Sequence, residues 1–475
     1  MSNPSSALRP SLDLRTGSQR VFAHILASSL VVSVANFTIW FAVTFWTYLE
    51  TRSVLATGLI AGIFLVATAS TGIWFGSIVD HHRKQVVIQA SAVTSFVFYA
   101  VGLGLYLAVP ESEWRDAASP LLWVFVVVSM IGVIAGNLRG IALPTLVTLL
   151  VPEHLRDRAN GLVGTASGVS FLVTSVISGL LVAFDGMRSV LVLALAVMAG
   201  SFLHVSRLSV DEPVIVSTNE DGSADRGVDL RGTFRIVRGV PGLLALIVFS
   251  CFNNFLGGTF MALMDAYGLS LVSVQAWGLL WGVLSAGVII GGLMVARTGV
   301  GANPVRTLLL VNVVLWTTCV VFPIRSSIVL LAVSMMAFML VMPYAEASEQ
   351  TILQRVVPFH RQGRVFGFAQ SVEQAASPLT AFLIAPITQL LVIPFMTDGS
   401  GARVLGPWFG TGADRGIALV FVVAGLIGLL VTGLALLSRP YRRLSAAYKS
   451  SSAAPIAIVD DTGGGDSGLV VPLPR

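Results

Sequence analysis

The chain has 475 residues, of which 55% are hydrophobic and only 11% are charged, and its formal net charge is +5. Soluble domains carry about 25% charged residues, so this composition excludes a large soluble protein and indicates a polytopic membrane protein. Cys251 and Cys319 both fall inside apolar runs, so we expect neither a disulfide framework nor a zinc site. The sequence has no GxxxxGK loop and no HExxH or GxSxG motif, so we expect no ATP-driven step, no enzymatic activity and no cofactor.

Twelve apolar runs approach or exceed the roughly 20 residues with which a helix crosses a bilayer. In chain order they are residues 21–46, 55–79, 86–108, 122–149, 162–184, 187–203, 243–263, 276–295, 305–322, 328–353, 365–393 and 417–437. The fold class predicted is therefore an all-α polytopic membrane protein with two six-helix bundles.

The polar segments between and around these runs set the expected domain boundaries. We predict a cytoplasmic N-terminal segment (1–20), a first bundle (21–205), a cytoplasmic linker with an amphipathic helix (206–241), a second bundle (242–438) and a disordered cytoplasmic tail (439–475).

Lys and Arg residues are distributed unevenly between the two sides of the membrane that these runs define. With both termini on one side, that side holds 22 of the 29 Lys and Arg residues and the other side holds six, while Arg139 alone lies deep within a run. Because cytoplasmic loops carry the excess of positive charge, we expect both termini in the cytoplasm and the chain in the cytoplasmic membrane. The net charge is then a topology signal, aided by anionic lipid, and gives no reason to expect nucleic acid as a partner.

Two pairs of segments repeat between the halves of the chain. The polar loop GSIVDHHRK (76–84) joins the second and third runs and predicts a tight hairpin at the membrane surface, and a weaker copy, GLMVARTGVG (292–301), joins the eighth and ninth. VPEHLRDRANG (151–161) and VVPFHRQGRVFG (356–367) close the fourth and tenth runs. These echoes indicate two parallel six-span repeats, as in transporters whose halves are related by an axis along the membrane normal.

The same motifs carry a family resemblance. The glycine–acid–basic loop at 76–84, RANGL after the fourth run, QRVVPFHRQGRVFG after the tenth and WFGTGADRG before the twelfth resemble the major facilitator superfamily, in the exporter branch that includes macrolide-type and siderophore exporters. The resemblance covers about residues 20–438. It implies a gating motif of Gly76, Asp80, Arg83 and Lys84, in which Gly76 permits close helix approach and the Asp80 carboxylate interacts with the positive end of span eleven.

Four charged residues lie deep within the predicted spans, where each costs roughly 2.5–3.5 kcal/mol and so calls for a reason. Arg139 precedes Pro152 by 13 residues and Glu346 precedes Pro358 by 12, so both lie about 18–20 Å from the cytoplasmic loops and, in the fold that the resemblance implies, could face each other across a central cavity. They are interpreted either as a polar transport centre or as a static ion pair between spans four and ten.

The other two acids also have two interpretations each. Glu349, one turn from Glu346, either forms an inner gate with Arg361 or Arg364 or takes part directly in proton coupling. Glu373, together with Gln370 and Gln374, forms a polar stripe on span eleven that serves proton coupling or helix packing.

Neutral side chains complete the list of candidates. Asn36 in span one is expected on the substrate pathway, and because it cannot titrate, the proton site is expected in the second half. Asn253 and Asn254 are either substrate contacts or helix–helix hydrogen bonds, and Trp281 either stacks on a lipophilic substrate or packs in the core.

Together these observations favour a monomeric secondary transporter that exports amphipathic small molecules, drugs or a secondary metabolite in exchange for protons. The first alternative is an uptake symporter for an anionic solute, with Arg139 as the anion anchor. The second is a membrane sensor or scaffold that transports nothing.

Overall fold

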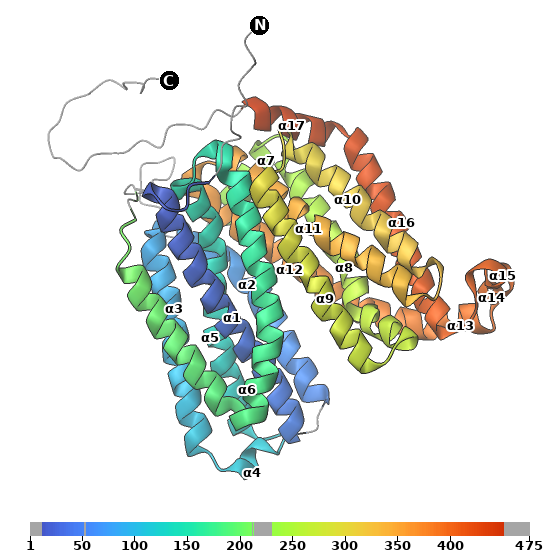
Figure 1. Cartoon of the computed structure of the whole chain (residues 1–475), viewed down its shortest axis with the longest axis horizontal. Coiled ribbons are helices and arrows are strands. Elements are labelled where there is room, and N and C mark those ends of the chain that lie inside the picture. The colour runs from blue at the N-terminus through green and yellow to red at the C-terminus, as the bar shows by residue number, and fades with distance from the viewer. Residues whose placement is uncertain (1–11, 52–53, 211, 213–229, 451–475) are drawn as a thin grey trace, which may run out of the picture.

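In the computed structural model, which describes residues 12–51, 54–210, 212 and 230–450, all regular secondary structure is helical (Figure 1). The first half of the chain forms α1 (Gly17–Thr51), α2 (Val54–His81), α3 (Lys84–Ala108), α4 (Glu111–Trp114), α5 (Pro120–Leu150), the 3-10 turn η1 (Glu153–Leu155) and α6 (Arg156–Ser206). The second half forms α7 (Leu230–Gly239), α8 (Leu243–Leu271), α9 (Val274–Thr298), α10 (Pro304–Val321), η2 (Phe322–Ile324), α11 (Ile328–Val356), η3 (Phe359–Arg361), α12 (Gln362–Ile387), the π-helical turn η4 (Thr388–Val392), α13 (Ile393–Thr397), α14 (Ser400–Val404), α15 (Gly406–Phe409), α16 (Ala413–Leu437) and α17 (Arg439–Ser450).

Several long helices begin at residues suited to cap them. Ser119, Ser273, Asn303 and Ser327 each stand just before a helix, and each side chain accepts a hydrogen bond from a backbone N–H three residues on. Such a cap satisfies one of the amide groups that the first helical turn leaves without a partner. The capping residues therefore fix where the apolar runs of α5, α9, α10 and α11 become helix.

All twelve predicted apolar runs lie in helices. Within the described residues, eleven helices are long and apolar enough to cross a membrane, which confirms a multi-pass membrane protein. The fifth and sixth runs both lie in α6, which changes direction at Asp185 and Gly186, where the backbone leaves helical values. Gly186 has φ +55°, a conformation that residues with a Cβ rarely adopt, so a glycine is required at this reversal.

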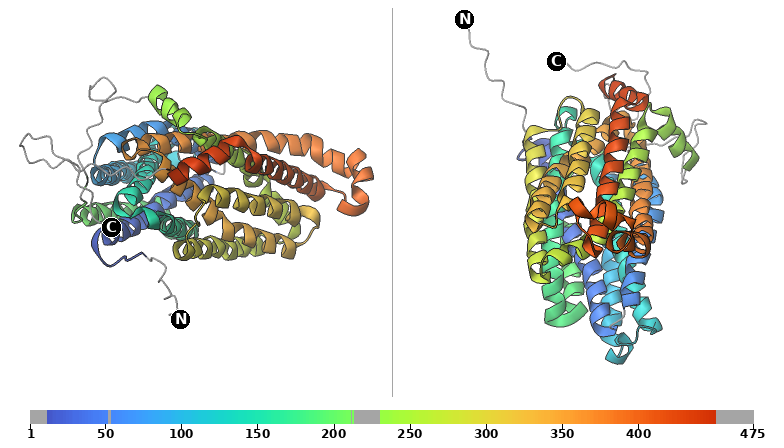
Figure 2. Two further views of the ribbon diagram at one scale, coloured as in Figure 1. Left: turned by 90° about the horizontal axis from the view of Figure 1, so that it is seen from above. Right: turned by 90° about the vertical axis from the view of Figure 1, so that its right-hand side faces the viewer.

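The helices form two bundles, which we call the N half (α1–α6) and the C half (α8–α16), and they run side by side in Figures 1 and 2. The main contacts between the halves are α2 against α12 and α6 against α9. A Cβ added to Gly76 in α2 would meet the carbonyl oxygen of Gly363 in α12. The predicted role of Gly76 in close helix approach is consistent with this crossing.

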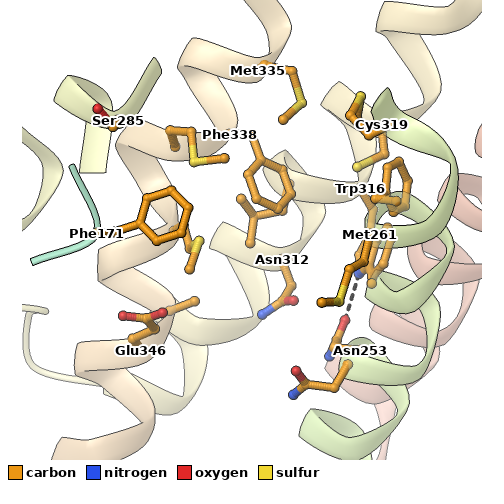
Figure 3. Close-up of a pocket in the computed structure, with 18 of the residues that line it drawn as sticks. Phe171, Asn253, Met261, Ser285, Asn312, Trp316, Cys319, Met335, Phe338 and Glu346 are labelled. Carbon is orange, nitrogen blue, oxygen red and sulfur yellow. Dashed lines mark hydrogen bonds between the residues drawn. The ribbon is translucent and has the colours of Figure 1, made fainter. Parts of the chain in front are cut away.

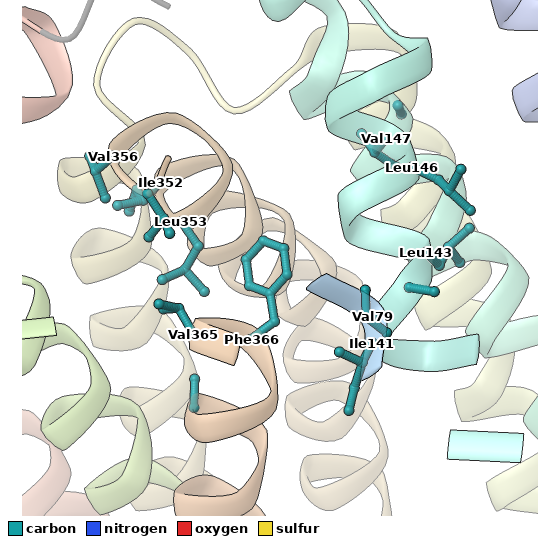
Figure 4. Packing of buried hydrophobic residues seen from close by; sticks show 14 of the residues in the cluster. Val79, Ile141, Leu143, Leu146, Val147, Ile352, Leu353, Val356, Val365 and Phe366 are labelled. Atoms are coloured by element: carbon teal, nitrogen blue, oxygen red, sulfur yellow. The ribbon is translucent and has the colours of Figure 1, made fainter. Parts of the chain in front are cut away.

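The two halves are joined at one end and separate at the other. We call the end at which α1 begins and α17 lies the terminus end, and the opposite end, with α4 and α14, the far end (Figure 1). A buried apolar cluster at the terminus end includes Val79 and Leu146 from the N half and Leu353 and Phe366 from the C half (Figure 4). Toward the far end the ribbons of the two halves diverge (Figure 1).

Two amphipathic helices lie at the terminus end. α7 falls in the predicted amphipathic stretch of the linker. α17 corrects the prediction of a disordered tail for residues 439–450, since Tyr441, Leu444 and Tyr448 form one face that is buried against the C half. The rest of the predicted tail, 451–475, lies outside the described residues, as do residues 1–11.

Candidate functional site

A cavity of about 900 Å³ lies mainly within the C half, between α8, α9, α10 and α11 (Figure 3). It reaches from Ser250 and Glu349, in its deeper part, to Asp265 near the far end of α8. Asp265 is 15 residues beyond Ser250, which corresponds to about 22 Å along the helix. The N half contributes only three side chains to the wall, those of Phe41, Phe171 and Leu172.

This cavity makes the two halves unequal. In the N half α1 packs along α5, whereas the corresponding helices of the C half, α8 and α11, have almost no direct contact. The space between them is the cavity. The second repeat therefore holds a hollow where the first holds packed side chains.

Most of the cavity wall is apolar and built from adaptable side chains. Five methionines line it, together with a set of aromatic rings; the methionines are Met261, Met264, Met335, Met339 and Met342. Unbranched thioethers adjust to ligands of different shape and make favourable contacts with aromatic rings. Such a wall suits amphipathic molecules of varied shape.

The asparagines of the cavity wall present acceptors to its interior. Asn253, Asn254 and Asn312 each donate their side-chain amide to the backbone carbonyl four residues earlier, at 2.9, 3.0 and 2.9 Å. Their Oδ1 atoms are thereby turned away from their own helices. Asn253 Oδ1 accepts a hydrogen bond from the Trp316 indole N–H at 2.7 Å (Figure 3).

Three glutamates of the C half lie in or next to the cavity. The Glu346 side chain is exposed in the cavity (Figure 3). Glu349 lies one turn further along α11, and its Oε1 accepts a hydrogen bond from Ser250 Oγ at 2.7 Å. The third, Glu373, belongs to α12 and shares a smaller cavity with Glu349.

Glu349 stands at the junction between two cavities. It lines the large cavity and also a smaller one of about 180 Å³ between α5, α11 and α12. Gln370 and Glu373 line this smaller cavity, while Gln374 does not. Of the two predicted partners of Glu349, Arg364 is turned toward α2, where its Nε lies 3.7 Å from an Asp80 carboxylate oxygen.

Arg139 does not face Glu346, so the predicted juxtaposition across the cavity is wrong. The guanidinium is 3% exposed and lies inside the N half, where it donates to Ser28 Oγ of α1 at 3.1 Å and to Ser201 Oγ of α6 at 3.0 Å. It lines neither cavity.

Asn36 is also buried within the N half and does not line the cavity, which corrects its predicted place on the substrate pathway. Its Oδ1 accepts a hydrogen bond from the Tyr99 hydroxyl at 2.6 Å, and the amide packs against Gly136 of α5. Asn36 and Arg139 thus both hold helices of the N half together.

The Asp80 carboxylate joins the two halves at the terminus end. It is 1% exposed and accepts hydrogen bonds from the backbone N–H groups of Gly363 at 2.6 Å and Arg364 at 2.8 Å, at the start of α12. Within the helix these amide N–H groups have no carbonyl partner, because they belong to its first turn, which is also the positive end of the helix dipole. His81 adds a second contact, with its Nε2 2.8 Å from an Arg364 guanidinium nitrogen.

The other two residues of the predicted gating motif differ in their exposure. Lys84 is buried, and its Nζ lies 5.5 Å from the centre of the Phe359 ring in the C half. Arg83 is exposed at the turn before α3. Sequence reasoning missed Glu212, whose carboxylate caps α3 by accepting from the backbone N–H groups of Lys84 at 2.6 Å and Gln85 at 2.8 Å.

Further polar contacts close the terminus end. Arg355 and Glu153 form an ion pair at 2.9 Å, and the Asp157 carboxylate accepts from the Val300 N–H at 2.9 Å. The Arg355 guanidinium also lies 4.4 Å from the Tyr448 ring of α17. Every hydrogen bond found between the halves in the described part of the chain lies at this end, so the cavity is closed from the terminus end.

Sequence reasoning also missed Asp265, Asn312 and the methionines of the cavity wall. The only signal was a polar side chain inside an apolar run for Asn312 and two residues beyond one for Asp265, a weak signal because such amides and acids also stabilise helix packing. No group of three or more His, Cys, Asp or Glu residues suited to a metal ion occurs in the part of the chain that the structure describes.

Two packed bundles of membrane-spanning helices, one of which holds a cavity lined by carboxylates, are typical of a membrane transporter and not of an enzyme. The Major Facilitator Superfamily family model matches residues 25–381, and the chain belongs to this superfamily. A comparison with curated proteins found no match.

Solved structures with the same fold come from diverse transporters. The chain is similar to the human organic anion transporter MFSD10 (TETRAN), with a TM-score of 0.66 at 12% identity over 87% of this chain and 100% of the other. It is similar to a bacterial homologue of the iron transporter ferroportin in an outward-facing state, with a TM-score of 0.64 at 14% identity over 88% and 100%. The proton:xylose symporter XylE gives a TM-score of 0.60 at 13% identity over 91% and 100%. At these identities the similarity establishes the fold alone.

Proposed function

We propose that this protein exports amphipathic small molecules across the cytoplasmic membrane in exchange for protons, by alternating access. Both termini are placed in the cytoplasm, as the distribution of Lys and Arg predicts. The arrangement described here, closed at the terminus end and apart at the far end, is then the outward-facing state.

The observation that carries this proposal is the position of Glu349 and Glu373. Both carboxyl groups line the same small cavity of about 180 Å³. Two negative charges confined in one cavity repel each other, which favours the uptake of a proton by one of the two groups. Since Glu349 also lines the large cavity, a change in its protonation alters the contacts of any molecule bound in that cavity. This is the physical link that exchange of a substrate for a proton requires.

The size and lining of the large cavity support amphipathic substrates. A volume of about 900 Å³ is in the range of cavities that hold drug-sized molecules. Its methionine and aromatic wall suits an apolar body, and its asparagines and carboxylates suit a polar group. In the proposed cycle, rocking of the halves exposes this wall alternately to each side of the membrane.

Two alternatives are less well supported. Uptake of an anionic solute anchored by Arg139 is disfavoured because neither Arg139 nor any other Lys or Arg lines the large cavity. A sensor or scaffold that transports nothing predicts no substrate-dependent proton flux, and no change in the labelling of Cys251 or Cys319 from either side of the membrane.

The test uses the full chain in liposomes that contain a pH-sensitive dye. A panel of amphipathic compounds is screened for substrate-dependent proton flux, first with the wild-type protein and then with Glu349→Gln and Glu373→Gln. In both variants the proton flux is expected to fall at least about tenfold, because a glutamine cannot release a proton. Glu111→Gln, which changes an exposed carboxylate at the far end, is the matched control. Full flux in the double variant Glu349→Gln/Glu373→Gln would contradict the proposal.

A further inference from the structure

The polar groups of the large cavity offer more hydrogen-bond acceptors than donors. Ser250 and Ser285 each use their hydroxyl proton, on Glu349 at 2.7 Å and on the Gly282 carbonyl at 2.7 Å. The Trp316 N–H is likewise used by Asn253. The donors left in the wall are the Trp281 indole N–H, which has no such bond in the described part of the chain, and the second N–H of each asparagine amide.

Acceptors, by contrast, remain available. Asn312 is 6% exposed, its side chain points into the cavity (Figure 3), and one N–H of its amide is used on the Leu308 carbonyl, which leaves Oδ1 directed away from its helix. Asn254 has the same arrangement, with one N–H on the Ser250 carbonyl. A carbonyl oxygen at a cavity wall favours a ligand that supplies a hydrogen-bond donor or a positive charge.

The charged side chains of the cavity wall also favour a cation, because they are acidic. Asp265, Glu346 and Glu349 line the cavity, and no Lys or Arg does. Asp265 accepts a hydrogen bond from the Trp277 indole at 2.9 Å, which fixes its carboxylate near the far end. Glu346 is exposed in the cavity, so a ligand can reach it.

We propose that the C-half cavity is a binding site for lipophilic organic cations, with Glu346 as the counter-ion and Asn254 and Asn312 as supporting acceptors. The aromatic rings of Trp281, Trp316 and Phe338 hold the apolar body and can face a positive charge. This substrate class deepens the proposed function and rests on it for transport, but binding is testable without transport.

Tetraphenylphosphonium and tetraphenylborate are suitable probes because they have nearly the same shape and opposite charge. Equilibrium dialysis of each against the purified full-length protein measures the two affinities. The cation is expected to bind at least about tenfold more tightly than the anion. Glu346→Gln is expected to weaken cation binding by about tenfold, which is the effect of one partly hydrated opposite charge about 5 Å away.

Two further variants separate this effect from misfolding. Glu111→Gln removes a carboxylate outside the cavity and is expected to leave cation binding unchanged. Asn312→Asp keeps the shape of the side chain, adds a negative charge and is expected to tighten cation binding. A gain of affinity does not arise from loss of fold.

The outcomes also separate this proposal from the proposed function. Equal binding of the two probes, or an equal effect of Glu346→Gln and Glu111→Gln, would overturn the cation site, and proton-coupled efflux of neutral compounds in the same preparation would then leave the export function intact. Selective cation binding without proton-coupled flux of any compound would support the site and refute the exchange mechanism.

Discussion

Replacing Asp80 by asparagine tests whether the contact between α2 and α12 holds the closed terminus end. The carboxylate accepts two short hydrogen bonds from Gly363 and Arg364 and lies 3.7 Å from the Arg364 guanidinium. Asparagine has one acceptor oxygen and no charge, and its NH₂ group would oppose the second backbone N–H. The variant therefore loses one charge-assisted bond and weakens the other.

The magnitude follows from these contacts. A hydrogen bond to a charged group contributes about 1.5–3 kcal/mol, and a carboxylate at a partly buried helix N-terminus up to about 2 kcal/mol. Because these contributions overlap, Asp80→Asn is expected to disfavour the closed terminus end by about 3 kcal/mol, which shifts the conformational equilibrium roughly 100-fold. The fraction of molecules whose two halves are apart at the far end should decrease accordingly.

Distances between spin labels measure this population. Labels at Glu111→Cys and Arg403→Cys, exposed at the far ends of the N half and the C half, report their separation in a Cys251→Ser/Cys319→Ser background. The long-distance component is expected to decrease in Asp80→Asn.

A matched control is Asp116→Asn, since Asp116 accepts a backbone N–H at 2.8 Å within a far-end loop. If Asp80→Asn and Asp116→Asn gave the same distance distribution as the parent, the Asp80 contact would not hold the closed end, and the reasoning from helix-terminus hydrogen bonds would be refuted.

Two further predictions concern the N half. Arg139→Ala should lower thermal stability by a few kcal/mol, because it removes a buried side chain that joins Ser28 and Ser201, yet leave the charge preference of substrates unchanged; a change in that preference on dialysis would show that Arg139 acts on the ligand. Gly186→Ala should destabilise the reversal in α6 by about 1–2 kcal/mol, because φ is +55° there; an unchanged unfolding temperature would contradict this, and Gly200→Ala, at an open helical position, is the control.

The spans were predictable from sequence because membrane helices need long apolar runs, and each run predicted one helical arm. The direction of a side chain around its helix was not. Arg139 precedes Pro152 by 13 residues and Glu346 precedes Pro358 by 12, so the two lie at similar heights but differ by one residue, or about 100° of rotation. This rotation turns Arg139 into its bundle and Glu346 into the cavity.

Contacts between distant segments were predictable only in part. The resemblance implied that Asp80 approaches the start of span eleven, and the structure places it there. Nothing in the local sequence indicated that Glu212 reaches back to cap α3, or that Glu349 and Glu373 line the same small cavity, because these arrangements depend on how whole helices pack.

The two repeats differ in what they contain at their centres. Counting back from the equivalent prolines Pro152 and Pro358, the position of Glu346 corresponds in the first repeat to Gly140, which has no side chain to offer a ligand. The first repeat is thus packed at its centre, whereas the second encloses the cavity. Redesign of ligand preference can therefore be concentrated on α8, α10 and α11, while the packing of the N half is left unchanged.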